Sequence, residues 1–233
     1  MKKINLNETS PRRKFLQTLA AGSAAIGVAT VLTPFQQVQA EPVPLQNNSG
    51  PDEWFDKIKG KHRIVFDVTE PHEVFPFAWP KVFLLTNAAT GTPEKENSAV
   101  VILRHDAIGY AFPDSMWAKY NFGAMFKAND PKTKAPSMRN PFWQPKPGDF
   151  MIPGVGPVAI GINELQDSGV MFCVCNMAMT VYSAVVAEQM KMKKEDILKE
   201  WTENVLPGVQ IVPSGVWAVG RAQEHGCAYC FAG

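Results

Sequence analysis

Cys175 stands at a position where a cysteine side chain can become reactive. It ends an apolar run that starts at Val170, and a segment with the pattern of a helix begins directly after it. This order places the sulfur at the carboxyl edge of a sheet, where open α/β folds bind ligands. The first N–H groups of a helix favour negative charge there, and the thiolate is the reactive form of cysteine. Cys175 is therefore a candidate nucleophile, with Asn176 as the expected N-cap and a binding candidate; a buried structural thiol is the alternative.

The sequence around the other three cysteines gives less reason to assign them a function. Cys173 lies two residues before Cys175 on the same predicted strand, so the two side chains should share a face, and we expect Cys173 in the core. Cys227 and Cys230 have C-x-x-C spacing, but they fall on the last predicted strand, where their side chains would face opposite sides of the sheet. A disulfide from Cys175 to either of them, or a thiolate metal site that also uses His225, stays open as an alternative. We assign no metal and no cofactor.

His105 and Asp106 follow another predicted strand and so lie at the same edge of the sheet. His105 could orient or deprotonate a bound group, which makes it a second, weaker candidate; a solvated loop pair is the commoner meaning of this pattern. The chain has no G-x-G-x-x-G segment, no Walker loop and no recognisable hydrolase triad.

The elements that position these residues alternate between strands and helices. Such alternation predicts an α/β fold with a doubly wound, mostly parallel five-stranded sheet and helices on both faces. The predicted strands are 62–68, 98–105, 170–175, 209–212 and 227–231, and the predicted helices are 79–89, 114–120, 158–166, 177–190, 194–205 and 213–225.

A proline-rich segment interrupts this pattern at about 122–157. It also carries Phe142 and Trp143. An insertion of this length without regular structure is unusual in a compact domain and is often functional. Two interpretations remain open: an active-site lid, or a subunit-contact arm or surface decoration.

The first forty residues have the three parts of a twin-arginine signal peptide. Arg12 and Arg13 lie in a basic start, a weakly apolar stretch follows from 19 to 32, and small residues precede Ala40. We expect cleavage between Ala40 and Glu41 and export, in a folded state, to the periplasm. A retained membrane anchor is the alternative, but the apolar stretch is short and rich in Gly and Ala for a membrane span.

The mature chain then divides into a linker at 41–61 and a domain at 62–233. Hydrophobic content of 45% and charged content of 19% suit a globular protein. The whole chain has a formal charge of +1, and removing the five basic residues and one acidic residue of the leader leaves about −3. No basic face is evident, so we expect no nucleic-acid partner, and no later segment is apolar enough to span a membrane.

The last third of the chain resembles the DsrE/DsrF-like family, which has the YchN-like fold. The resemblance is carried by segments 169–176 and 206–216 and by an ending, Gln223 to Tyr229, that matches the family pattern Gln-x-x-Gly-x-x-Tyr. It implies a small α/β protein that assembles into trimers or hexamers. In some members a cysteine after the third strand carries sulfane sulfur, and Cys175 matches that position. Export, the insertion and the Cys227–Cys230 pair depart from the family pattern.

These observations favour a periplasmic protein that binds or relays sulfane sulfur through Cys175, with a sulfur-transfer or redox partner. Two other classes stay open. One is a non-enzymatic oligomeric module that binds a ligand or partner through its insertion, and the other is a thiol-redox or metal protein that uses Cys227 and Cys230. Whether the chain is an enzyme is left open.

Overall fold

The computed structural model of this chain describes residues 50–152, 154 and 156–233. All of them belong to one compact unit. The predicted signal peptide, its cleavage site at Ala40 and Glu41, and the predicted linker up to residue 49 lie outside the described residues. Among the described helices, none is both long and apolar enough to cross a membrane.

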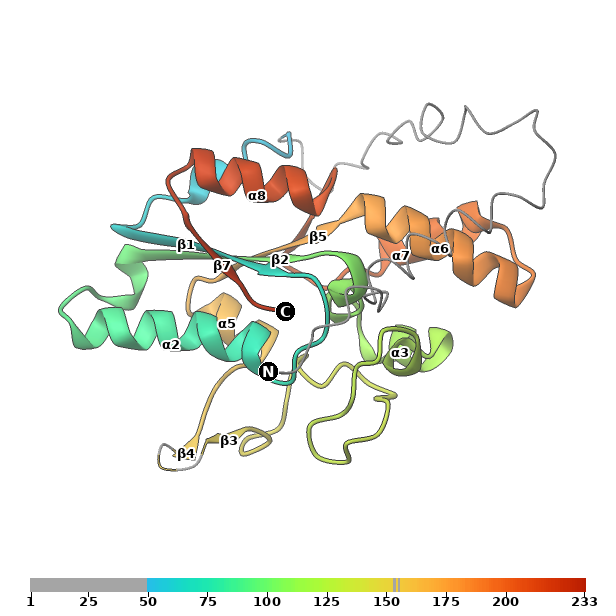
Figure 1. The fold of residues 1–233 in the computed structure, drawn as a ribbon, viewed down its shortest axis with the longest axis horizontal. Coiled ribbons are helices and arrows are strands. Elements are labelled where there is room, and N and C mark those ends of the chain that lie inside the picture. The colour runs from blue at the N-terminus through green and yellow to red at the C-terminus, as the bar shows by residue number, and fades with distance from the viewer. Residues whose placement is uncertain (1–49, 153, 155) are drawn as a thin grey trace, which may run out of the picture. The chain divides into compact units, whose positions relative to one another are not determined.

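The core of the fold is a five-stranded sheet in which every pair of neighbouring strands is parallel (Figure 1). The strand order is β6-β5-β2-β1-β7. The strands are β1 (His62–Val68), β2 (Asn97–Leu103), β5 (Met171–Cys175), β6 (Val209–Val212) and β7 (Ala228–Phe231). The predicted α/β fold with a doubly wound sheet is confirmed.

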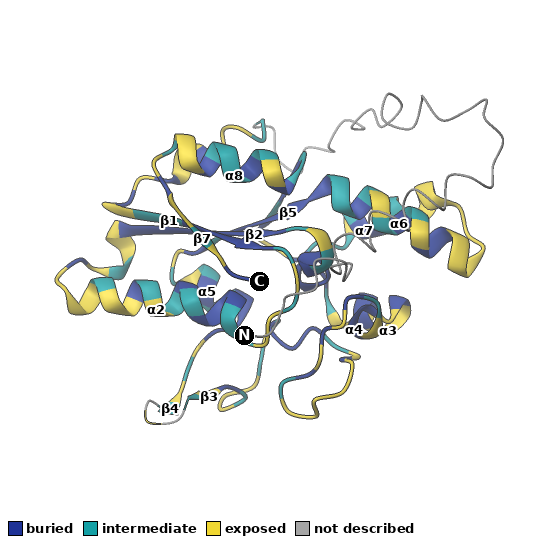
Figure 2. Cartoon of the chain, viewed as in Figure 1, coloured by how far each residue is buried: buried dark blue, intermediate teal, exposed yellow. Residues whose placement is uncertain are grey.

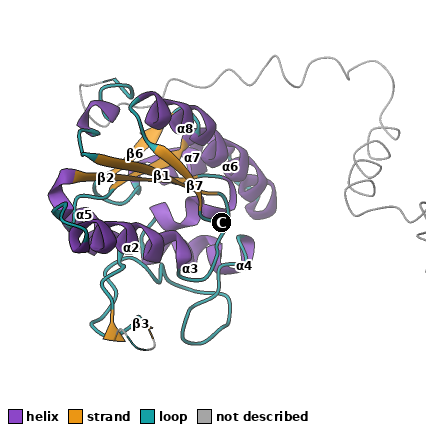
Figure 3. Ribbon diagram, turned by 60° about the vertical axis from the view of Figure 1, so that its left-hand side comes forward, coloured by secondary structure: helices purple, strands orange, loops and turns teal. Residues whose placement is uncertain are grey.

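Helices cover both faces of the sheet, because the chain reverses its direction across it. From β1 it proceeds to β2, β5 and β6, and it then crosses back to β7 on the other side of β1. Since crossovers between parallel strands are right-handed, the reversal moves the last helix to the opposite face. Figure 3 shows α2 (Phe75–Ala89) and α5 (Ile162–Asp167) on one face and α8 (Gly215–Glu224) on the other. Two further helices, α6 (Asn176–Met190) and α7 (Lys194–Glu203), pack against each other.

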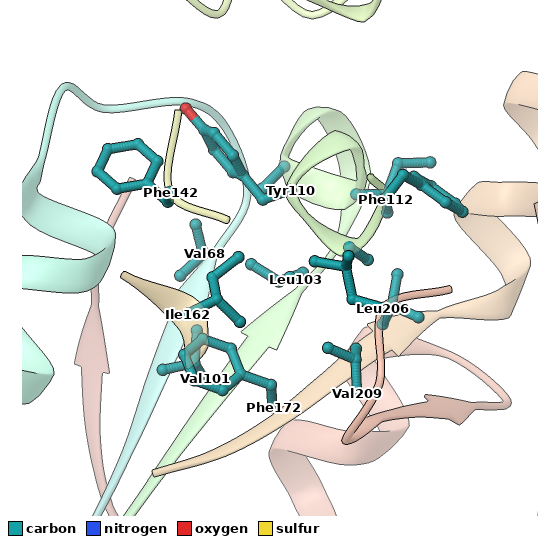
Figure 4. Close-up of a cluster of buried hydrophobic side chains, with 14 of the residues drawn as sticks. Val68, Val101, Leu103, Tyr110, Phe112, Phe142, Ile162, Phe172, Leu206 and Val209 are labelled. Carbon is teal, nitrogen blue, oxygen red and sulfur yellow. The ribbon is translucent and has the colours of Figure 1, made fainter. Parts of the chain in front are cut away.

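Alternate residues along the strands belong to two buried clusters, one on each face of the sheet. All of β2 is buried, as its dark blue colour in Figure 2 shows. Val100 and Ile102 belong to the cluster on the α8 side. Val101 and Leu103 belong to the cluster on the α2 side, part of which Figure 4 shows. Each such fully buried side chain contributes about 1.5–3 kcal/mol through removal from water. Strands buried on both faces explain the continuous apolar runs in the sequence.

Part of the predicted linker belongs to the core. Trp54, Phe55 and Ile58 are buried in the cluster on the α8 side, and a short 3₁₀-helix, η2 (Phe55–Lys57), carries Phe55. The segment then runs so close to β2 that a Cβ on Gly60 would overlap the backbone of Asn97. The expectation of a linker is therefore wrong for this stretch. Its polar and proline-rich surroundings concealed two aromatic side chains that cover one face of the sheet.

The proline-rich insertion is also part of the core, on the opposite face. Phe142 stacks between Phe77 of α2 and Phe150, with ring centroids 4.1 and 5.0 Å away. The buried side chain of Asn140 donates hydrogen bonds to the carbonyls of Tyr110 and Phe112, each at 2.9 Å. The segment contains α4 (Phe122–Met125) and the two-stranded β3 (Met151–Ile152) and β4 (Gly156–Pro157), and it follows α3 (Asp114–Tyr120). The interpretation as surface decoration is wrong for the buried residues Asn140, Phe142 and Phe150, whereas a contact with another subunit stays a prediction.

Several element boundaries differ from the sequence prediction, and three of the differences affect the loops at the ends of the sheet. Helix α2 begins at Phe75, four residues earlier than expected, because Pro76 lies in its first turn, where proline is tolerated. Helix α5 begins at Ile162 rather than at 158. Strand β2 ends at Leu103, and the chain then enters an unpredicted 3₁₀-helix, η4 (His105–Ala111).

Candidate functional site

Cys175 and His105 line the same open pocket, which has a volume of about 310 Å³. The pocket lies at the carboxyl edge of the sheet, where β5 leads into α6 and where η4 and α8 begin. Its other principal lining residues are Arg104, Tyr182, Ser214 and Gly215. The structure thus brings together the two candidate residues that the sequence placed on separate strands.

Cys175 itself is the N-cap of α6. Its Sγ accepts a hydrogen bond from the backbone N–H of Ala178 at 3.3 Å. The prediction that Asn176 is the N-cap is wrong: Asn176 is the first residue of the helix and is buried. Only 6% of Cys175 is exposed, and the residue forms part of the wall of the pocket. The helix amides at this position stabilise negative charge on sulfur.

Arg104 brings a fixed positive charge to the pocket. Its guanidinium donates two hydrogen bonds to Asp67 at the end of β1, and Tyr229 of β7 donates a third to the same carboxylate at 2.9 Å. Hydrogen bonding to Asp67 raises the pKa of Arg104, burial opposes this shift, and smaller contributions come from the charges of Asp67, Tyr229 and Cys175. A Cβ on Gly215 would overlap the Arg104 side chain, so the glycine at the start of α8 lets the two elements approach.

His105 lies at the mouth of the pocket with 64% of its side chain exposed. Its backbone has a left-handed φ of 50°, and its Nδ1 lies 3.4 Å from a carboxylate oxygen of Asp106. The hydroxyl of Tyr182 donates a hydrogen bond to the same oxygen. Burial and this hydrogen bond raise the pKa of Tyr182, so its hydroxyl keeps its proton and remains a donor. This arrangement holds Asp106 beside the imidazole, whose exposed ring lines the pocket.

A second helix N-terminus reaches the same pocket. Ser214 is the N-cap of α8, and its Oγ accepts a hydrogen bond from the N–H of Trp217 at 3.2 Å. The N–H of Met177 donates to the carbonyl of Pro213 at 3.2 Å, which ties the starts of α6 and α8 together. Sequence reasoning missed Arg104 and Ser214 as site residues. The available signals were a basic residue directly after a buried strand and a serine directly before a glycine-initiated helix.

Cys173 lies in the core, as expected. It is fully buried in the cluster on the α8 side, and burial raises its pKa. Cys175 belongs to the other cluster, so the expectation that the two thiols pack on one face is wrong. The alternation of the strand ends at Cys175, because that residue adopts the N-cap position of the following helix.

Cys227 and Cys230 are remote from the pocket. Cys227 packs in the cluster on the α8 side, and Cys230 packs against the cluster on the other face. Two strands, β2 and β1, separate β5 from β7, so Cys175 lies about 14 Å from β7 across the sheet, beyond the reach of a disulfide. All four thiols are free. Within the part of the chain that the structure describes, no group of three or more His, Cys, Asp or Glu side chains is placed to hold a metal ion.

The opposite edge of the sheet carries a basic groove, which the sequence did not reveal. Five cationic residues line it, together with Glu96 and Asp167, around a volume of about 740 Å³. They are Lys57, Lys59, Lys61, Arg63 and Lys95. The expectation of no basic face is therefore wrong, because folding gathers lysines from the predicted linker beside the start of β2.

No protein-family model matches this chain, and no curated protein matches it. One similar solved structure is that of a protein of unknown function, MTH1491 from Methanobacterium thermoautotrophicum. The two sequences are 18% identical, the TM-score is 0.39, and the alignment covers 73% of this chain and 99% of that chain. Membership of the DsrE/DsrF-like family therefore stays a prediction that rests on the sequence segments given above.

Proposed function

We propose that this chain is an exported, periplasmic DsrE-like protein that binds or relays sulfane sulfur on Cys175. The observation that carries the proposal is the position of the sulfur. Cys175 is both the N-cap of α6 and part of the wall of an open pocket that Arg104 and His105 also line. A thiol in this setting can exchange sulfur with a small anion that enters the pocket.

The loading reaction is a displacement at sulfur. The Cys175 thiolate attacks the outer sulfur of thiosulfate, a new S–S bond forms on the protein, and the S–S bond of thiosulfate breaks. Sulfite leaves with the electron pair of that bond, and a persulfide anion remains on Cys175. The total charge is unchanged, and no external oxidant or reductant is consumed. In delivery, an acceptor thiolate takes the outer sulfur and restores the Cys175 thiolate.

Arg104 and His105 have distinct roles in this proposal. Asp67 holds the Arg104 guanidinium in place, so a positive charge attracts the anionic donor and stabilises the leaving sulfite. His105 lines the same pocket as Cys175, and its exposed imidazole is the candidate acceptor for the thiol proton before attack. The N–H of Ala178 stabilises the negative charge of the sulfur before and after transfer.

The rim of the pocket fits a protein acceptor or a second copy of the chain. Val181 and Val216 line the pocket and are 53% and 71% exposed, and Val185 lies one helical turn after Val181. Apolar side chains grouped around a reactive residue favour contact with another protein surface. A homo-oligomer, a trimer or a hexamer by the family resemblance, and a sulfur-transfer partner are part of this proposal.

Peptide mass spectrometry after treatment with thiosulfate or polysulfide tests the proposal. We expect the mass of one added sulfur atom on Cys175, no addition in Cys175→Ser, and normal loading in the matched control Cys230→Ser. Cys227 is an internal reference, because burial raises its pKa to about 11 and leaves it protonated at neutral pH. An unmodified Cys175, or equal loading of Cys227 and Cys175, would rule out the proposed carrier.

A further inference from the structure

A second pocket, of about 270 Å³, opens at the carboxyl end of β1. It forms between the loop from β1 to α2, the end of η4 and the first part of the insertion. Its polar lining residues include His72, Glu73, Tyr110, Lys127, Asp130 and Lys134. Neither Cys175 nor any other residue of the first pocket contributes to it.

The hydroxyl of Tyr110 is the main reason to consider this pocket a binding site. Tyr110 is only 2% exposed, and its ring packs against Phe77 and Phe142 with centroids 5.1 and 5.5 Å away. In Figure 4 its oxygen lies at the end of the ring that points away from the aliphatic cluster. Within residues 50–152, 154 and 156–233, no hydrogen bond satisfies this hydroxyl. The hydroxyl oxygen is not among the fully buried polar atoms that lack a partner, so it is open to the pocket, where an acceptor atom of a ligand can replace water as its partner.

Tyr110 acts as a donor in this position. Burial raises its pKa above the ordinary value, so the hydroxyl keeps its proton at neutral pH. Its own backbone carbonyl is already paired with Asn140, which fixes the residue at the end of η4. The pocket therefore presents a hydroxyl group, held in place by its buried ring, that can donate a hydrogen bond to a ligand.

The backbone around the pocket is unusually strained. Glu73, Lys127 and Lys134 all have left-handed φ angles, of 50°, 55° and 59°. Each such residue costs about 1 kcal/mol or more, and strain of this kind gathers at ligand sites. Hydrogen bonds hold the strained turn: Asp130 accepts from the N–H of Lys134 through its carbonyl, and from two further backbone amides through its carboxylate.

The charges of the pocket favour an anion. Lys127 and Lys134 form no ion pair with any described residue, so their ammonium groups are available. The carboxylate of Asp130 is already engaged by Arg139 at 3.1 Å. Burial of Asp130 is the largest single effect and raises the pKa of its carboxyl group. Hydrogen bonds from Lys132 and Thr133 and the charge of Arg139 together outweigh burial, so the pKa is lowered overall. One carboxylate, that of Glu73, remains as an acceptor for a ligand hydroxyl or amino group.

We propose that this pocket binds a small organic anion whose carboxylate or phosphate group accepts a hydrogen bond from Tyr110 and pairs with Lys127 and Lys134. Hydroxy acids, amino acids and phosphorylated small molecules belong to this class. The insertion thereby gains a role, because it supplies both lysines. The site is independent of the sulfur chemistry proposed for Cys175.

Calorimetric titration of the full chain with citrate, L-glutamate and inorganic phosphate tests this site. We expect saturable binding of at least one probe, with a Kd of about 1 mM or tighter. Tyr110→Phe, which removes a single oxygen atom, should weaken that binding at least tenfold, and the double variant Lys127→Gln/Lys134→Gln should weaken it and reduce its salt dependence. Binding of phosphate alone would identify a phosphate ligand, and binding of citrate or glutamate a carboxylate ligand.

Two matched controls separate this site from other effects. Tyr120→Phe removes a hydroxyl that pairs with Glu200 outside the pocket, and Cys175→Ser removes only the proposed sulfur carrier. Both should bind the probe as the parent chain does. Absence of binding by all three probes would overturn the proposal, as would unchanged binding in both Tyr110→Phe and the double lysine variant.

Discussion

The guanidinium of Arg104 and the carboxylate of Asp67 form a two-pronged hydrogen-bonded ion pair, from Nε to Oδ1 at 2.6 Å and from Nη2 to Oδ2 at 2.8 Å. Only 3% of the Asp67 side chain is exposed, against 27% of Arg104. The pair joins the carboxyl ends of β1 and β2 and fixes a cation that lines the pocket together with Cys175. A buried pair of this geometry is costly to break, because removing one partner leaves the other charge uncompensated.

Asp67→Asn should therefore destabilise the fold by about 2 kcal/mol. The loss is smaller than that expected for a fully buried ion pair, because Arg104 is partly exposed to solvent. Urea unfolding at pH 7 measures this loss. The exposed acidic residue Glu188 supplies the control, since Glu188→Gln should change stability by less than about 0.5 kcal/mol. Under the proposed function, Asp67→Asn should also slow sulfur loading of Cys175 while the thiol remains present. Equal stability of the two variants would show that the ion pair between Asp67 and Arg104 contributes little to the free energy of unfolding.

The packing of the insertion depends on a close approach between the backbones of Gly123, in α4, and Ser137. A Cβ on Gly123 would overlap the backbone nitrogen and carbonyl of Ser137. Gly123→Ala should therefore cost about 3 kcal/mol and separate the insertion from the core, which limited proteolysis at 126–150 would detect.

Gly220 provides the matched control for that substitution. It lies inside α8, and apart from the backbone of its own helix no atom lies within 4 Å of the position that its Cβ would occupy. Gly220→Ala should stabilise the fold by about 0.5–1 kcal/mol, because alanine has the higher helix propensity. A loss of stability of similar size in both variants would contradict the close packing described for the insertion.

The sheet was predictable because its signals are local. β2 and β5 are runs of apolar residues, and each is followed by a polar or reactive side chain at the carboxyl edge. That arrangement alone pointed to Cys175 and to His105 before their common pocket was known. The N-cap was misplaced by one residue because asparagine is a preferred cap and cysteine is not, yet the sulfur of Cys175 accepts the capping hydrogen bond.

The remaining features depend on contacts between distant segments. Trp54 and Phe55 occur among polar residues, and only the exposed face of the completed sheet gives them a place to pack. The pocket around Tyr110 likewise combines residues from 71–74 with residues from 127–134, and no sequence period links those segments. Sequence patterns report which face of an element is buried, but they do not report which loops meet at its end.

The start of the insertion is also held by a charged cluster whose effect depends on pH. Glu200 accepts hydrogen bonds from Lys119 at 2.6 Å and from the hydroxyl of Tyr120 at 2.7 Å. The hydrogen bond from Lys119 lowers the pKa of Glu200, burial opposes it, and the hydrogen bond from Tyr120 adds to the lowering. Because the pKa is lower in the folded chain than in the unfolded one, the stabilisation is present above the unfolded value of about 4.3 and is lost as the pH falls through the folded value.

Glu200→Gln should consequently reduce stability by about 0.5–1 kcal/mol at pH 7, a modest amount because the pair is partly exposed. The difference from the parent chain should stay constant from about pH 6 to pH 8 and should shrink below about pH 4, where the parent carboxylate also becomes protonated. Thermal or urea unfolding at a series of pH values measures both quantities. Glu203→Gln is the control, since Lys199 lies 3.9 Å from that carboxylate on an exposed helix surface and the pair contributes little. A Glu200→Gln difference that persists unchanged at pH 3 would show that the carboxylate charge is not what stabilises this cluster, and would leave the stacking of Tyr120 on Phe122 as its main support.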